Sequence, residues 1–154
     1  MQKIGSLVDS LRKDFPEVKF KKSDDFRWDS NNQAIMYDGS REESALLTLH
    51  ELAHAVLGHK SYSTDVELIR MEAEAWDHVR TSLSKRYSVV FDEEFAEEQT
   101  DTYRNWLYKR SRCPKCECVG FQQTDTNSYK CPMCGITWQV SAERQKRLYR
   151  KRKK

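Results

Sequence analysis

The chain has 154 residues, of which 38% are hydrophobic and 33% are charged, so its length suits one domain of ordinary size with a small appendage. No apolar run approaches the ~20 residues that a membrane-spanning helix needs. The amphipathic N-terminal segment also lacks the apolar stretch and cleavage site of a secretory signal. These features predict a cytoplasmic protein with no membrane partner.

The charged residues are distributed unevenly along the chain. Residues 112–154 carry 11 of the 27 Lys and Arg but only 3 of the 24 Asp and Glu, which leaves 16 basic and 21 acidic residues in 1–111. A mildly acidic body followed by a strongly basic end predicts a polyanionic partner for the basic end alone.

The N-terminal third predicts one helix followed by a small sheet. Apolar residues at helical spacing indicate a helix over residues 4–13. Extended runs follow at 18–20, 26–28 and 34–37, and the turn-forming sequence DSNNQ at 29–33 separates the last two. A β-hairpin or small meander is therefore expected here.

Three longer helices are expected next. Two capping-box signatures, in which Ser or Thr precedes Glu by three residues, predict helix starts at Ser40 with Glu43 and at Thr64 with Glu67. The first of these helices is expected to end at residue 57, before Gly58, and the second at about residue 84. A third helix is expected over residues 92–109.

The helix before Gly58 carries the sequence His50-Glu51-Leu52-Ala53-His54. Residues four apart lie on one face of a helix, so His50 and His54 can ligate one metal ion. Glu51 is rotated by roughly 100° from His50 and lies beside the metal. Zinc acidifies water and polarises a carbonyl, while the carboxylate accepts the proton. The motif therefore predicts a metallopeptidase with Glu51 as its catalytic residue.

A third protein ligand is needed, and the sequence leaves two alternatives. Glu72 and Glu74 follow His50 by 22 and 24 residues, and because they lie two apart on a helix they cannot both reach one metal ion. His59 stands at the wrong spacing for the HExxHxxGxxH pattern and is expected to mark the helix end instead. Candidates to stabilise the oxyanion are Tyr62, His78 and Tyr87, and the sequence does not select among them.

The segment LHELAHAVLGH at 49–59, followed by EAEAW at 72–76, resembles the ImmA/IrrE family of small bacterial and phage zinc metallopeptidases over about residues 25–85. The resemblance implies an α+β fold with a gluzincin-like core of helices packed on a small sheet. It implies that Glu72 is the third ligand, although the family often has Asn or Asp where this chain has Trp76. We expect the 34–37 strand to be the sheet edge to which an extended substrate adds.

The cysteines predict a second metal site. Cys113, Cys116, Cys131 and Cys134 form two CPxC pairs separated by 14 residues, which is the spacing of a structural zinc ribbon. Cys118 is left over. We therefore expect a metallopeptidase domain over residues 1–110, a zinc ribbon over 111–140 and a basic tail over 141–154. SprT-like proteases, which act on DNA-bound proteins, are similar in joining HExxH to such a ribbon, but their third ligand is a histidine.

The predicted function is hydrolysis of a peptide bond in a protein substrate, with DNA-associated proteins as a candidate class. It would use one catalytic and one structural zinc ion. The residues expected to contact nucleic acid are Arg144, Lys146, Arg147, Arg150, Lys151 and Arg152. The alternative is a catalytically silent, zinc-stabilised scaffold that acts through its ribbon and basic tail as a nucleic-acid-binding or regulatory protein.

Overall fold

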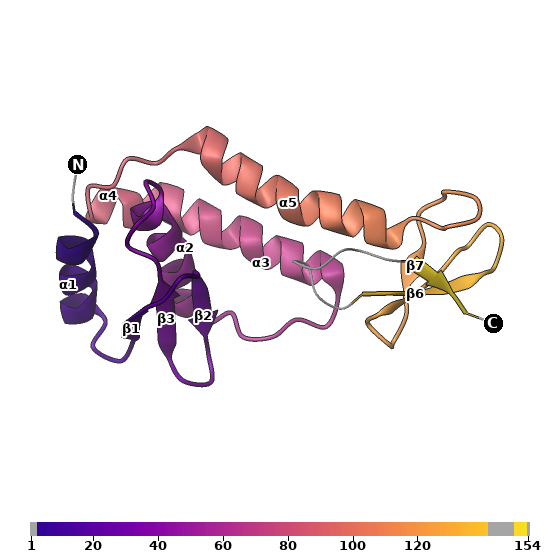
Figure 1. Ribbon diagram of the computed structural model, residues 1–154, viewed down its shortest axis with the longest axis horizontal. Helices are drawn as coiled ribbons and strands as arrows, with labels where there is room; N and C mark the ends of the chain where they lie inside the picture. Colours follow the sequence, from indigo (N-terminus) through magenta and orange to yellow (C-terminus); the bar gives the residue numbers. More distant parts are fainter. Residues whose placement is uncertain (1–2, 142–149, 154) are drawn as a thin grey trace. The chain divides into compact units, whose positions relative to one another are not determined.

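The computed structural model describes residues 3–141 and 150–153 and has an α+β architecture with two small sheets (Figure 1). The chain divides into two compact units. One comprises Met1–Ser61 with Met71–Glu93, and the other comprises Tyr62–Arg70 with Glu94–Lys154. No helix within the described residues is both long enough and apolar enough to cross a membrane.

The first unit opens with the elements α1 (Ile4–Asp14), β1 (Lys19–Lys22), β2 (Arg27–Asp29), β3 (Ala34–Tyr37) and α2 (Ser44–Val56). Its sheet has the order β1-β3-β2, with β1 parallel and β2 antiparallel to β3. The expected hairpin is therefore confirmed as β2-β3. Both β2 and β3 contact α2, which carries the HExxH sequence.

The expectation that the 34–37 strand forms a sheet edge is wrong. β3 is the central strand and pairs with a neighbour on each side. Its sequence AIMY is apolar throughout, and three of its four side chains are buried, as is typical of a strand covered on both faces. The edges are instead β1 and β2, and the lysines of β1 at 19, 21 and 22 are exposed, a common protection of sheet edges.

Helix α2 is mostly buried, because leucine and alanine surround its two histidines. The capping box predicted at Ser40 is wrong: the Ser40 hydroxyl donates to Asp38 (2.6 Å), and the helix begins at Ser44. The end at Gly58 is confirmed. Gly58 has φ 71°, and the amides of Gly58 and His59 donate to the carbonyls of Ala55 and His54, which together form a Schellman motif.

The next helical stretch begins after Thr64, whose hydroxyl accepts the Glu67 amide as predicted (3.2 Å). It consists of α3 (Asp65–His78), the π-helical segment η1 (Val79–Leu83) and α4 (Ser84–Arg86). Helix α5 (Glu93–Ser111) follows and confirms the third predicted helix.

The cysteine module, residues 112–141 with 150–153, contains the second sheet. Its strands are β4 (Phe121–Gln122), β5 (Ser128–Lys130), β6 (Thr137–Val140) and β7 (Arg150–Arg152), in that order and all antiparallel. Residues 150–152, expected in a basic tail, thus pair with β6. The core of the module consists of Cys113, Tyr129, Cys131, Trp138 and Val140.

A buried ion pair joins α3 and α5 to this module within the second unit. Arg110 and Asp65 are each 2% exposed, and the Arg110 Nε donates to the Asp65 carboxylate at 2.7 Å. The remaining guanidinium nitrogens donate to the carbonyls of Thr126 and Ser141. Tyr129 donates its hydroxyl proton to the same Asp65 oxygen. Every charge in this network is therefore hydrogen-bonded, as burial requires.

Candidate metal centres

Three buried donor atoms converge where α2 meets α3. His50, His54 and Glu72 are 5%, 7% and 6% exposed. The two His Nε2 atoms lie 3.1 Å apart. The Glu72 carboxylate spans them, with one oxygen 2.9 Å from His50 Nε2 and the other 3.1 Å from His54 Nε2. This His2Glu group could hold a metal ion.

The chemistry of these donors fits a cation. Two imidazole nitrogens and one carboxylate oxygen are ligands that zinc accepts in a catalytic site, where a fourth position stays open. Two Nε2 atoms in mutual contact cannot both be acceptors without a proton or a cation between them. The hydrogen bonds from both histidines outweigh burial and hold the pKa of Glu72 well below its usual range, so its carboxylate is charged.

Glu72, rather than Glu74, faces the two histidines. The Glu72 side chain is 8% exposed, whereas that of Glu74 is 50% exposed and contacts His59 instead. The spacing of two residues on α3 separates their directions, as expected from helical geometry.

Glu51 lies next to the group in a desolvated position. Burial raises the pKa of the Glu51 carboxyl, although the nearby histidines and the backbone amide of Trp28 act in the opposite direction. A raised pKa makes the ionised carboxylate a stronger base, which suits Glu51 to exchanging a proton with a neighbouring group.

The sequence did not reveal the contacts that surround the two histidines. The His54 Nδ1 lies 2.9 Å from the His59 Nδ1, and the His59 Nε2 lies 3.0 Å from the Glu74 carboxylate. Trp76 stacks on His50, with ring centroids 4.2 Å apart. The contact between His54 and His59 could have been predicted from the sequence. A Schellman motif brings the residue after its glycine, here His59, against the residue five positions earlier, here His54.

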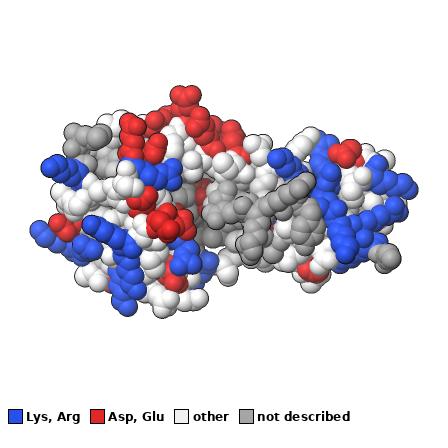
Figure 2. All heavy atoms as spheres, viewed as in Figure 1, with Lys and Arg blue, Asp and Glu red and all other residues white. Residues whose placement is uncertain are grey.

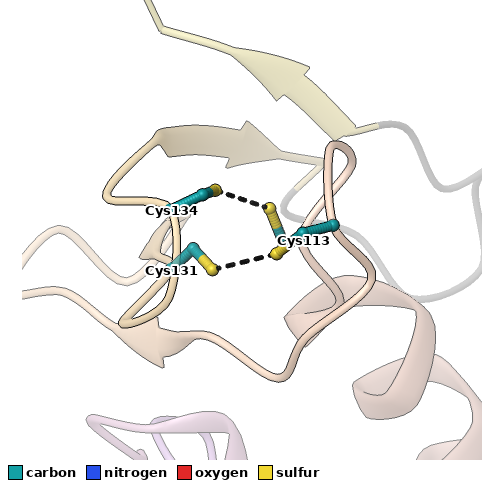
Figure 3. Close-up of side chains that lie close together, drawn as sticks. Cys113, Cys131 and Cys134 are labelled. Atoms are coloured by element: carbon teal, nitrogen blue, oxygen red, sulfur yellow. Dashed lines mark hydrogen bonds between the residues drawn. The ribbon is translucent and has the colours of Figure 1, made fainter.

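The four cysteines of the CPxC pairs also converge, and Figure 3 labels three of them, Cys113, Cys131 and Cys134. The Sγ of Cys113 lies 3.6 Å from that of Cys134, and the Sγ of Cys116 lies 3.4 Å from that of Cys131. These distances are too long for disulfides and close to the ~3.8 Å sulfur separation of a tetrahedron with ~2.3 Å zinc–sulfur bonds. The four thiols could therefore hold one metal ion.

The two CPxC turns have the same backbone pattern, which explains Cys118. The amide of Cys131 donates to the carbonyl of Ile136, and the amide of Cys113 donates to that of Cys118. Cys118 therefore occupies the position that Ile136 occupies in the second turn, two residues after the last cysteine of its CPxC pair. The residue just before it, Glu117, has φ 63°, where the second turn has Gly135 with φ 76°.

The remaining predicted site residues lie elsewhere. The Tyr87 hydroxyl donates to Asp14 (2.6 Å). Of the six predicted nucleic-acid contacts, Arg150, Lys151 and Arg152 form the exposed strand β7, and Arg144, Lys146 and Arg147 lie outside the described residues.

Comparison of the chain with models of protein families, with curated proteins and with solved structures found no match.

Proposed function

We propose that this protein is a zinc-dependent peptidase of the ImmA/IrrE-like, minigluzincin kind, in which His50, His54 and Glu72 hold the metal ion. The observation that carries the proposal is the convergence of these three buried donor atoms beside the buried carboxyl group of Glu51. Zinc would supply a Lewis acid that polarises a peptide carbonyl and acidifies water. Glu51 would take a proton from the water and return it to the leaving amine.

The substrate would be an extended segment of a protein. β2 is an edge strand, and the backbone amide of Trp28 in this strand hydrogen-bonds to Glu51. A peptide that adds to β2 by main-chain hydrogen bonds would therefore lie beside the catalytic carboxyl group. This assignment replaces β3, whose two edges are already paired.

The first test is zinc content at saturating zinc. Wild type should bind two zinc ions, Glu72→Ala one, and Glu74→Ala, the matched control on the same helix, two. Hydrolysis of a pool of quenched fluorescent peptides should then require the first site and be abolished in Glu51→Gln, which retains its zinc. Cleavage that persists in Glu51→Gln would refute the mechanism. A zinc-loaded wild type that cleaves no peptide would favour the scaffold alternative.

The cysteine module would be a structural zinc ribbon that also binds nucleic acid. The observation in favour is strand β7, whose residues Arg150, Lys151 and Arg152 are all exposed. Figure 2 shows Lys and Arg side chains gathered over the part of the view that holds β6 and β7 in Figure 1. The ribbon would hold the peptidase near DNA-associated substrates by raising its effective concentration.

Fluorescence anisotropy with a labelled DNA duplex tests this second candidate. The double variant Lys151→Ala/Arg152→Ala should bind more weakly and with a shallower salt dependence, because phosphate contacts release counterions. Lys21→Ala/Lys22→Ala in β1 removes the same charge from another exposed strand and is the control. Equal losses in the two double variants would show that only net charge matters.

A further inference from the structure

We propose that His59 and Glu74 are positioning residues that orient His54 toward the metal ion, an inference that rests on the metal site of the proposed function. Three side chains form a continuous line: the His54 Nδ1 contacts the His59 Nδ1 at 2.9 Å, and the His59 Nε2 contacts the Glu74 carboxylate at 3.0 Å. The other nitrogen of His54, Nε2, faces Glu72 and His50.

The chemistry of imidazole assigns every proton along this line. A metal ion needs the lone pair of the His54 Nε2, so the Nδ1 of that ring carries the proton. That proton requires an acceptor, and the His59 Nδ1 is the atom in reach. The His59 proton must then lie on Nε2, where the Glu74 carboxylate accepts it. Glu74 thus fixes the tautomer of His59, and His59 fixes that of His54.

The backbone holds His59 in place for this role. In the Schellman motif at Gly58, the His59 amide donates to the His54 carbonyl at 2.9 Å. His54 and His59 are therefore held together by a backbone hydrogen bond as well as by the contact between their rings. The His59 carbonyl in turn accepts the indole N–H of Trp28 at 3.0 Å. The His59 side chain is only 10% exposed, which limits competition from water for the contact between the rings.

His50 has no comparable support within the part of the chain that the structure describes. Its Nδ1 is buried without a hydrogen-bond partner among those residues, and its ring stacks on Trp76 at an interplanar angle of 27°. Stacking restrains the plane of the His50 ring but accepts no proton. The hydrogen-bonded orientation of the ligands therefore depends on the line through His59.

The experiment measures Zn²⁺ affinity of the full chain by competition with a chelator, and the cysteine site in the same molecule is the internal reference. His59→Ala should weaken the His2Glu site by about 10- to 100-fold. His59→Asn should bind within a few-fold of wild type, because its amide oxygen can replace the Nδ1 acceptor. Glu74→Ala should lose less than His59→Ala, because the Glu74 side chain is half exposed.

The decisive variant is His59→Asn/Glu74→Ala. Asparagine has no tautomer to fix, so adding Glu74→Ala to His59→Asn should leave the zinc affinity of the His2Glu site unchanged. In a chain that keeps His59, Glu74→Ala should lower that affinity. Equal losses in His59→Ala and His59→Asn would overturn the inference and indicate a packing role. Zinc bound at the His2Glu site with no dependence on His59 would overturn it while leaving the proposed function intact. Failure of wild type to bind zinc there would overturn both.

Discussion

Replacement of Arg110 by alanine is expected to destabilise the second unit by about 3–5 kcal/mol, the usual cost of removing one partner of a buried ion pair. The guanidinium is 2% exposed and donates to the Asp65 carboxylate at 2.7 Å and to the Thr126 carbonyl at 3.0 Å. Alanine can make neither bond. It leaves the Asp65 carboxylate buried with its positive partner gone.

The magnitude follows from these losses. A hydrogen bond to a charged group contributes about 1.5–3 kcal/mol, and an unpaired buried acceptor costs a further ~1–3 kcal/mol. The Arg110 guanidinium also lies 4.7 Å from the Trp106 ring centroid, a cation–π contact of roughly 0.5–2 kcal/mol. Tyr129 still donates to Asp65, which keeps the total below the sum of these figures. Because a domain is stable by only about 5–15 kcal/mol, the loss is a large fraction of the whole.

Urea unfolding at a fixed excess of zinc measures the change. Arg104→Ala is the matched control, because Arg104 lies on the same helix but is 48% exposed and pairs with Glu97 and Asp101 at the surface. Its removal should cost less than about 1 kcal/mol. The double variant Asp65→Asn/Arg110→Met removes both charges and should cost less than the sum of the two single changes. A cost for Arg110→Ala no larger than that for Arg104→Ala would refute the reasoning, as would strict additivity in the double variant.

Three further predictions concern single positions. A Cβ on Gly120 would lie 2.3 Å from a ring carbon of buried Trp138, so Gly120→Ala should cost about 1–3 kcal/mol by overpacking, seen as a lower thermal midpoint. Glu117 has φ 63°, so Glu117→Gly should stabilise the cysteine module by about 1 kcal/mol, and an unchanged midpoint would contradict this. Burial and the hydrogen bond to Asp14 raise the pKa of Tyr87 to about 12, above its ordinary ~10. The protonated Tyr87 hydroxyl therefore stabilises the fold fully below pH ~10, and this contribution is lost as the pH rises to ~12. The difference in the free energy of unfolding between wild type and Tyr87→Phe should shrink over that pH range.

The parts of the candidate sites that follow from local spacing could be predicted from the sequence. His50 and His54 share a helix face because four residues make about one turn, and Gly58 ends that helix because only glycine adopts positive φ at little cost. Each CPxC turn brings its own two thiols close for the same local reason, whereas the two turns meet through contacts between residues 15 and 21 apart in sequence. Glu72 could be preferred over Glu74 only through the family resemblance, since either could face α2 from the sequence alone.

The features that the sequence did not yield depend on tertiary contacts. The position of β3 in the middle of its sheet depends on β1 pairing in parallel across an intervening strand, which no local pattern encodes. Ser40 failed as a cap because the helix begins four residues later, at Ser44. Ser40 instead belongs to a turn in which the Asp38 carboxylate accepts both its backbone amide and its hydroxyl. The Arg110–Asp65 pair joins residues 45 apart in sequence, and both residues suited a solvated helix face equally well.

The stacking of Trp76 on His50 gives the protein a built-in optical signal. The indole centroid lies 4.2 Å from the centroid of the His50 ring, so a paramagnetic ion such as Co²⁺, if held by that ring, would quench the indole emission. Trp138 packs in the same cluster as Cys113 and Cys131, two of the four cysteines whose thiols converge. Comparison of wild type with Trp76→Phe and with Trp138→Phe would show how much of the fluorescence change on metal addition comes from each tryptophan, without an attached dye.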